Sequence, residues 1–156
     1  MSEATITTTG TDEGLGEVTI VREFDAPRDL IWAAFMDPEQ LSRFWGPIGM
    51  STPADRIVLE PRVGGRFLTV MVHDESGDEY PTTGEFVEFD EPNVFAFREP
   101  DSGMISQSTF EDLGDGRTRL TIHQTNVPAP YRSPDALAGF NTALDKLVTY
   151  LAEVQA

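Results

Sequence analysis

The sequence predicts an α+β domain in which a curved antiparallel sheet surrounds one long helix near the C-terminal end. Residues 54–126 alternate between strand-like segments and turn-forming clusters of Asp, Gly, Pro and Asn. Residues 137–151 place apolar side chains three and four positions apart, as an amphipathic helix does. A sheet with one apolar face must be covered, and only this helix is long enough to cover it.

The first sixteen residues are polar and rich in threonine and show no periodicity, so we expect a disordered tail over 1–16. One domain should fill the remainder, 17–156. Its first strand starts at Glu17, where apolar and polar residues begin to alternate. One face of this strand carries Val18, Ile20, Arg22 and Phe24.

Two short helices are expected next. Pro27 suits a first helical turn, and apolar residues recur at helical spacing after it. Asp37 can cap a second helix with Pro38 in its first turn, and Gln40 can complete a capping box. Gly46 and Pro47 should end that helix.

Six strands should follow: Arg56–Glu60, Gly65–His73, Glu79–Phe89, Val94–Glu99, Met104–Leu113 and Arg117–Thr125. Together with the first strand they make a seven-stranded sheet. The element order is therefore one strand, two helices, six strands and the final helix. Strongly twisted strands that curl around a helix do not close tightly everywhere, so we expect a hollow near the two short helices.

Composition restricts the partners. The chain has 27 acidic and 11 basic residues, and a net charge of −16 repels nucleic-acid phosphates and anionic lipid surfaces. No apolar run is long enough to insert into a membrane, and the start does not resemble a signal peptide, so we expect a cytoplasmic protein. The chain has no cysteine and two isolated histidines, so we expect neither a metal nor a cofactor.

Several motifs resemble the START-like helix-grip superfamily (SRPBCC), and more narrowly its branch related to the activator of the heat-shock protein 90 ATPase. They are Val18–Pro27, Trp32, Asp37–Leu41, Phe44–Pro47, Gly64–Phe67, Gly84–Pro92 and Gly139-Phe140. The resemblance runs from about Glu17 to Val154 and implies the helix-grip fold. It is less specific for activity, because members of this superfamily include lipid and polyketide binders, cyclases, toxin-resistance proteins and chaperone regulators.

Aromatic and thioether side chains are numerous, and together they suit the lining of a pocket for a flat or lipid-like apolar ligand. Each of them alone could equally be core. The residues that we expect to line the hollow are Arg22, Trp32, Phe35, Trp45, Phe67, Met71, Phe86, Phe97, Phe140 and Leu144.

Arg22 shares the phase of its apolar neighbours, so its guanidinium should be buried and paired. Glu85 or Glu88 could form a salt bridge with it across the sheet. Alternatively, Arg22 could anchor a carboxylate or phenolate of a ligand.

Binding of a small hydrophobic molecule is the leading functional hypothesis, and two alternatives remain. A cyclase or hydrolase would use polar residues in the same hollow, namely Arg22, His73, Tyr80, Glu85 or His123. A chaperone-regulating or stress-response domain, as the resemblance implies, would dock a basic partner through loops such as Met50–Asp55. The protein would act as a monomer or a homodimer.

Overall fold

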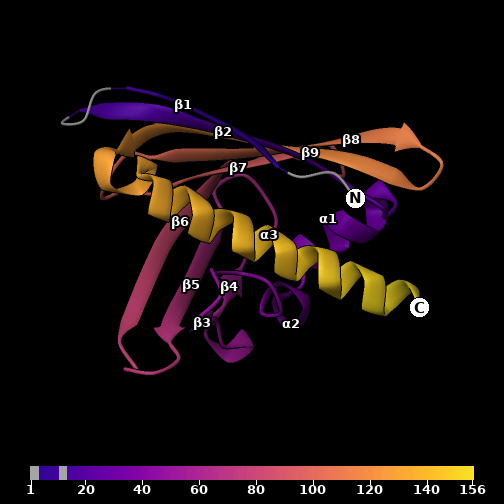
Figure 1. The fold of residues 1–156 in the computed structure, drawn as a ribbon, viewed down its shortest axis with the longest axis horizontal. Coiled ribbons are helices and arrows are strands. Elements are labelled where there is room, and N and C mark those ends of the chain that lie inside the picture. The colour runs from indigo at the N-terminus through magenta and orange to yellow at the C-terminus, as the bar shows by residue number, and fades with distance from the viewer. Residues whose placement is uncertain (1–3, 11–13) are drawn as a thin grey trace.

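The computed structural model describes residues 4–10 and 14–156, and over these ranges the strands form a single nine-stranded antiparallel sheet (Figure 1). The strands run in the order β1-β2-β9-β8-β7-β6-β5-β3, and β4 pairs with β5. Their bounds are β1 Thr5–Thr9, β2 Leu15–Phe24, β3 Met50–Ser51, β4 Val58–Leu59, β5 Arg66–His73, β6 Glu79–Asp90, β7 Val94–Arg98, β8 Ile105–Gly114 and β9 Arg117–Pro128. The predicted α+β class and helix-grip architecture are confirmed.

The sheet has two strands more than the expected seven. Thr5–Thr9 pair with Val21–Glu17 as β1, so the prediction of a disordered tail is wrong for these residues. Threonine is β-branched and fits a strand at the free edge of β2, whereas the prediction rested on the polarity of the segment. Residues 1–3 and 11–13, which the same prediction included, lie outside the described residues. The other added strand is the two-residue β3.

The two short helices start where the sequence indicates, but the second ends at Leu41, before the predicted stop at Gly46 and Pro47. The helices are α1 Arg28–Met36, α2 Pro38–Leu41 and α3 Pro134–Gln155, with 3-10 turns at η1 Ala54–Arg56 and η2 Ala129–Arg132. Asp37 caps α2 by accepting from Glu39 N at 3.1 Å, while the Gln40 side chain donates to the Asp37 carboxylate at 3.0 Å instead of accepting from the Asp37 N–H as in a capping box. Ser133 caps α3 by accepting from Ala136 N at 3.1 Å.

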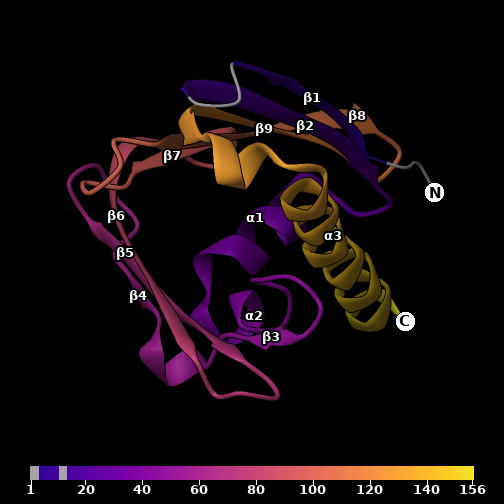
Figure 2. The ribbon, with the colours of Figure 1, turned by 60° about the vertical axis from the view of Figure 1, so that its left-hand side comes forward.

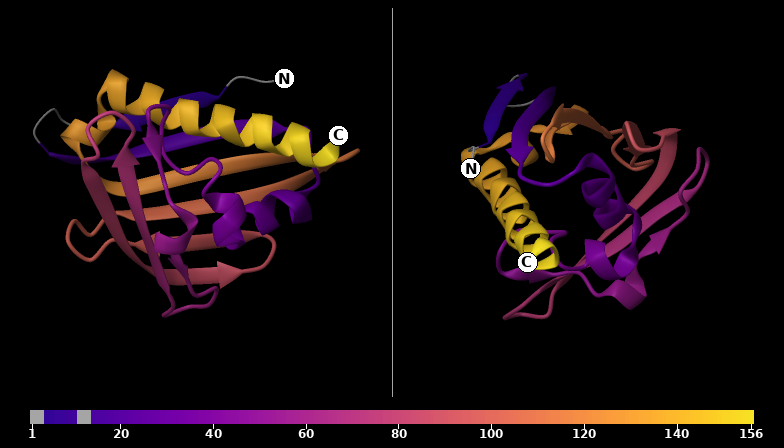
Figure 3. Two further views of the ribbon diagram at one scale, coloured as in Figure 1. Left: turned by 90° about the horizontal axis from the view of Figure 1, so that it is seen from below. Right: turned by 90° about the vertical axis from the view of Figure 1, so that its right-hand side faces the viewer.

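The sheet bends so that its two arms enclose the helices (Figures 2 and 3). Strands β1, β2, β8 and β9 form one arm, and β5 and β6 form the other. Helix α3 faces β5 and β6 across the bend, with α1 and α2 between them. None of the helices within residues 4–10 and 14–156 has the length and apolar composition needed to cross a membrane.

The inner face of the sheet follows the predicted alternation. Val18, Ile20, Arg22 and Phe24 of β2 are all buried, and the intervening residues are more exposed. On the other arm, Gly84 of β6 leaves room for a ring of β7. A Cβ at Gly84 would stand 3.1 Å from Phe97 Cδ2, closer than ordinary van der Waals contact.

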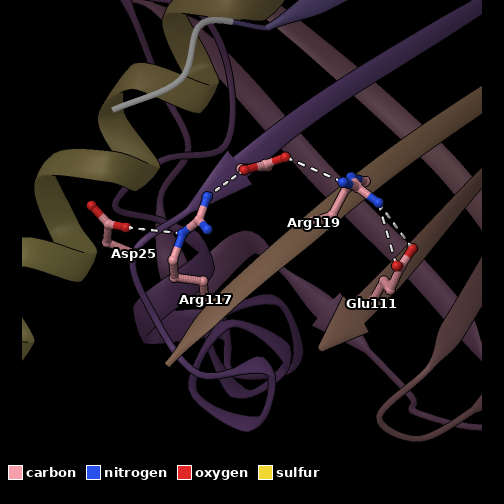
Figure 4. A network of polar contacts seen from close by, with 5 residues as sticks. Asp25, Glu111, Arg117 and Arg119 are labelled. Carbon is pink, nitrogen blue, oxygen red and sulfur yellow. Dashed lines mark hydrogen bonds and ion pairs between the residues drawn. The ribbon is translucent and has the colours of Figure 1, made fainter. Parts of the chain in front are cut away.

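The outer face carries a chain of ion pairs (Figure 4). Glu23 of β2 accepts from both Arg117 and Arg119 of β9, and Arg119 reaches Glu111 of β8 at 3.3 Å. Arg117 also lies 3.7 Å from Asp25. Such exposed pairs contribute about 0–1 kcal/mol each, so they matter less to stability than the aromatic core.

Candidate functional site

A cavity of about 200 Å³ lies between the first half of α3, the loop after α2 and the inner face of β5–β9. Most of its wall is apolar. The loop after α2 also contributes Pro47, and α3 contributes Ala143. The other apolar side chains of the wall are Phe35, Phe44, Trp45, Met71, Phe95, Phe97, Met104, Ile122, Phe140 and Leu144.

Six of the ten residues expected to line the hollow do line this cavity: Phe35, Trp45, Met71, Phe97, Phe140 and Leu144. They come from α1, the loop after α2, β5, β7 and α3, so the fold brings together side chains that are far apart in the sequence. Their contact with a ligand stays a prediction.

Three expected residues support the wall from behind. Phe67 contacts Trp45 and Phe97, with ring centroids 5.2 and 4.8 Å apart, and Phe86 packs against Phe67 at 5.7 Å. Trp32 packs among three rings of the sheet at 5.4–5.7 Å and lies in the core. None of the three is part of the cavity wall.

Arg22 is buried as expected, but its side chain is directed to α3. Its Nη2 lies 2.8 Å from Asp145 Oδ1, and its Nη1 donates to Asn141 Oδ1 at 3.1 Å. The predicted partners Glu85 and Glu88 are wrong, because β6 is separated from β2 by three strands and both side chains are exposed. Arg22 is not part of the cavity wall, so the structure gives no support to its role as a ligand anchor.

The polar part of the cavity wall consists of Thr82, Glu99, Ser106, Ser108 and Gln124. The sequence did not single these residues out, because separate Thr, Glu, Ser and Gln residues on strands form no recognisable motif. The period of two contains part of the missing signal, since Glu99, Ser108 and Gln124 each stand two positions from a buried aromatic or aliphatic residue.

Glu99 follows Phe95 and Phe97 at intervals of two and is half-buried. Over the described ranges, no hydrogen bond or ion pair involves its carboxylate. Burial raises the pKa of Glu99 above its usual range, and the nearby negative charge of Asp101 raises it further. On the same cavity wall, Gln124 Nε2 donates to Ser106 Oγ at 3.5 Å.

Helix α3 holds the loop that forms one rim of the cavity. Lys146 Nζ donates to the carbonyl oxygens of Pro47 and Met50, both at 3.2 Å, and Ile48 N donates to Thr142 Oγ1 at 3.1 Å. Burial lowers the pKa of Lys146, with an opposing effect from Asp74. The rim is therefore fixed by polar contacts, and the residues of this loop that line the cavity are Phe44, Trp45, Gly46 and Pro47.

The residues expected for an enzyme do not gather in the cavity. His73 accepts from Ser76 N at 3.2 Å, and His123 Nε2 lies 2.7 Å from Glu17 Oε1 on the other side of the sheet. Tyr80 and Glu85 are exposed. Across residues 4–10 and 14–156, no cluster of three or more His, Asp or Glu could hold a metal ion.

The model of one family, described as Activator of Hsp90 ATPase homolog 1-like protein, matches residues 25–152. No curated protein matches the chain.

Solved structures share the fold. Protein Ms6760 from Mycobacterium smegmatis is 27% identical with a TM-score of 0.74, over 96% of this chain and 99% of that one. Protein CV1439 from Chromobacterium violaceum is 25% identical with a TM-score of 0.77, over 86% and 96% of the two chains. The AHSA1 protein SPO3351 from Silicibacter pomeroyi is 24% identical with a TM-score of 0.71, over 87% and 97%.

Proposed function

This chain belongs to the Activator of Hsp90 ATPase homolog 1-like family, and from that premise we propose that it binds a small apolar molecule, preferably aromatic, between its sheet and α3. The observation that carries the proposal is the cavity itself, whose wall is mainly aromatic and thioether surface. Such walls suit flat apolar ligands, whereas a few polar groups set their orientation.

The size of the cavity limits the ligand. An apolar cavity of about 150 Å³ holds benzene, and a water molecule needs only about 10–15 Å³. A volume of about 200 Å³ therefore suits a molecule with one or two rings and exceeds the space of a few waters. A long acyl chain would need the rim loop to move, so the proposal favours a compact aromatic ligand over a lipid.

Toluene is a suitable probe ligand. A substitution that fills the cavity with a larger side chain tests whether toluene binds inside the cavity. Ala143 lines the cavity on α3, whereas Ala138 of the same helix is exposed and lies outside the wall. The wild-type protein and Ala138→Phe should bind toluene in a calorimetric titration, and Ala143→Phe should lose binding. Binding that persists in a folded Ala143→Phe protein, or no binding to the wild type, would contradict the proposal.

The enzyme alternative has lost its support, because none of its five expected residues lines the cavity. A chaperone contact through Met50–Asp55, suggested by the name of the family, stays a prediction.

A further inference from the structure

We infer that the natural ligand is an aromatic amine whose cationic nitrogen binds the Glu99 carboxylate. This inference rests on the proposed function and specifies the class of ligand. The cavity wall has one charged side chain, Glu99, among the residues that the structure describes. A carboxylate without a partner beside an apolar ligand site is a strong acceptor for a donor that the ligand brings.

Cationic side chains near the cavity are directed elsewhere. Lys146 donates to the carbonyl oxygens of Pro47 and Met50, and Arg22 pairs with Asp145. Neither lines the cavity. An anionic ligand would therefore meet a carboxylate without a compensating cation, in a protein with a net charge of −16. Carboxylate-bearing ligands are the class that this wall disfavours most.

The aromatic wall adds to the preference for a cation. Trp45 and Phe97 both line the cavity, and their rings lie 6.5 Å apart at an angle of 57°. Ring faces attract cations, most strongly in places shielded from water. The hydroxyl groups of Ser106 and Ser108 supply further acceptors on the same wall.

Backbone hydrogen bonds hold Glu99 at the turn between β7 and β8, where it lines the cavity. Glu99 N donates to Met104 O at 2.9 Å, and Gly103 N donates to Glu99 O at 2.8 Å, which closes the β7–β8 turn. The main chain that carries the Glu99 side chain is therefore already ordered by hydrogen bonds. Little further ordering of this main chain is needed when a ligand binds.

Three probes of similar shape separate charge from fit: toluene, benzylamine and benzoate. The wild-type protein should bind benzylamine about tenfold more tightly than toluene, as expected for one charge-assisted hydrogen bond, and benzoate more weakly than both. Glu99→Gln should bring the ratio of benzylamine to toluene affinity close to one. Glu85→Gln removes an exposed carboxylate outside the cavity wall and should keep the wild-type ratio.

The outcomes distinguish this inference from the proposed function. If toluene binds but benzylamine binds no more tightly, or if Glu99→Gln keeps the wild-type ratio, the inference is wrong and the proposed function stands. If none of the three probes binds, both are wrong. The folded state of each variant is checked by its thermal unfolding.

Discussion

Glu99 is a carboxylate in a place that disfavours its charge. Burial and Asp101 raise its pKa in the folded protein, so the native state holds its proton more tightly than the unfolded chain does. The stability that this group contributes is present at acidic pH and is lost as the pH rises through the folded-state pKa. The charged Glu99 carboxylate therefore destabilises the folded protein at neutral pH. Such destabilisation is typical of a group that serves binding rather than stability.

Replacing Glu99 by Gln should therefore raise the free energy of unfolding at neutral pH, because the amide keeps the shape without the charge. The gain over the wild type should shrink as the pH falls below the folded-state pKa of Glu99. Urea unfolding of both proteins at neutral and acidic pH measures this difference. A variant that is less stable than the wild type at neutral pH would show that the carboxylate has a stabilising partner.

Arg22 shows what the sequence predicts at the scale of a residue and what it does not. Its burial follows from the alternation of β2, and the structure confirms it with 7% exposure. Its partner depends on which distant element crosses the strand, and that element is α3, which contributes Asn141 and Asp145. The alternation of apolar and polar residues within one strand does not show which distant element will pack across that strand.

At the scale of elements, caps and periodicity predicted most boundaries. Asp37 caps α2 as predicted, and the apolar stripe of α3 buries Leu144, Leu147 and Leu151, whereas the Ser133 cap of α3 was not predicted. The edge strand β1 was missed because its threonines are polar, and its pairing with β2 depends on an edge that the local sequence does not show. The inward direction of Glu99 was predictable in principle, since it continues the phase of Phe95 and Phe97.

The contact between α3 and the rim loop gives a prediction at the same scale. Lys146→Met removes the donor to the Pro47 and Met50 carbonyls, and hydrogen bonds from charged groups contribute about 1.5–3 kcal/mol each. Because this site is partly exposed to water, we expect a loss of about 1–2 kcal/mol in the free energy of unfolding. The Ile48 amide should also exchange its hydrogen faster.

Thr149→Val is the matched control, because the Thr149 hydroxyl is exposed and donates only to Asp145 O of the same helix. It should leave the Ile48 amide unchanged. Equal exchange rates in the wild type and Lys146→Met would mean that the loop is held without the lysine.

At the scale of the whole molecule, the cavity results from the mismatch between a bent sheet and a straight helix. The family match and the shared fold of the solved structures cover most of the chain. The side chains that line the cavity come from α1, the loop after α2, five strands of the sheet and α3, so its existence could be anticipated from the architecture. Its volume and its polar residues depend on packing between these parts, which no local pattern determines.

Methionine methyl groups give the most direct test of the central claim, that this cavity holds a small aromatic molecule. Met71 and Met104 line the cavity, whereas Met36 and Met50 lie outside its wall. In a toluene titration of protein with ¹³C-labelled methionine methyls, the account predicts saturable shifts of the Met71 and Met104 signals and little change at Met36 and Met50. Unchanged Met71 and Met104 signals up to the solubility limit of toluene would contradict it, as would equal shifts of all four.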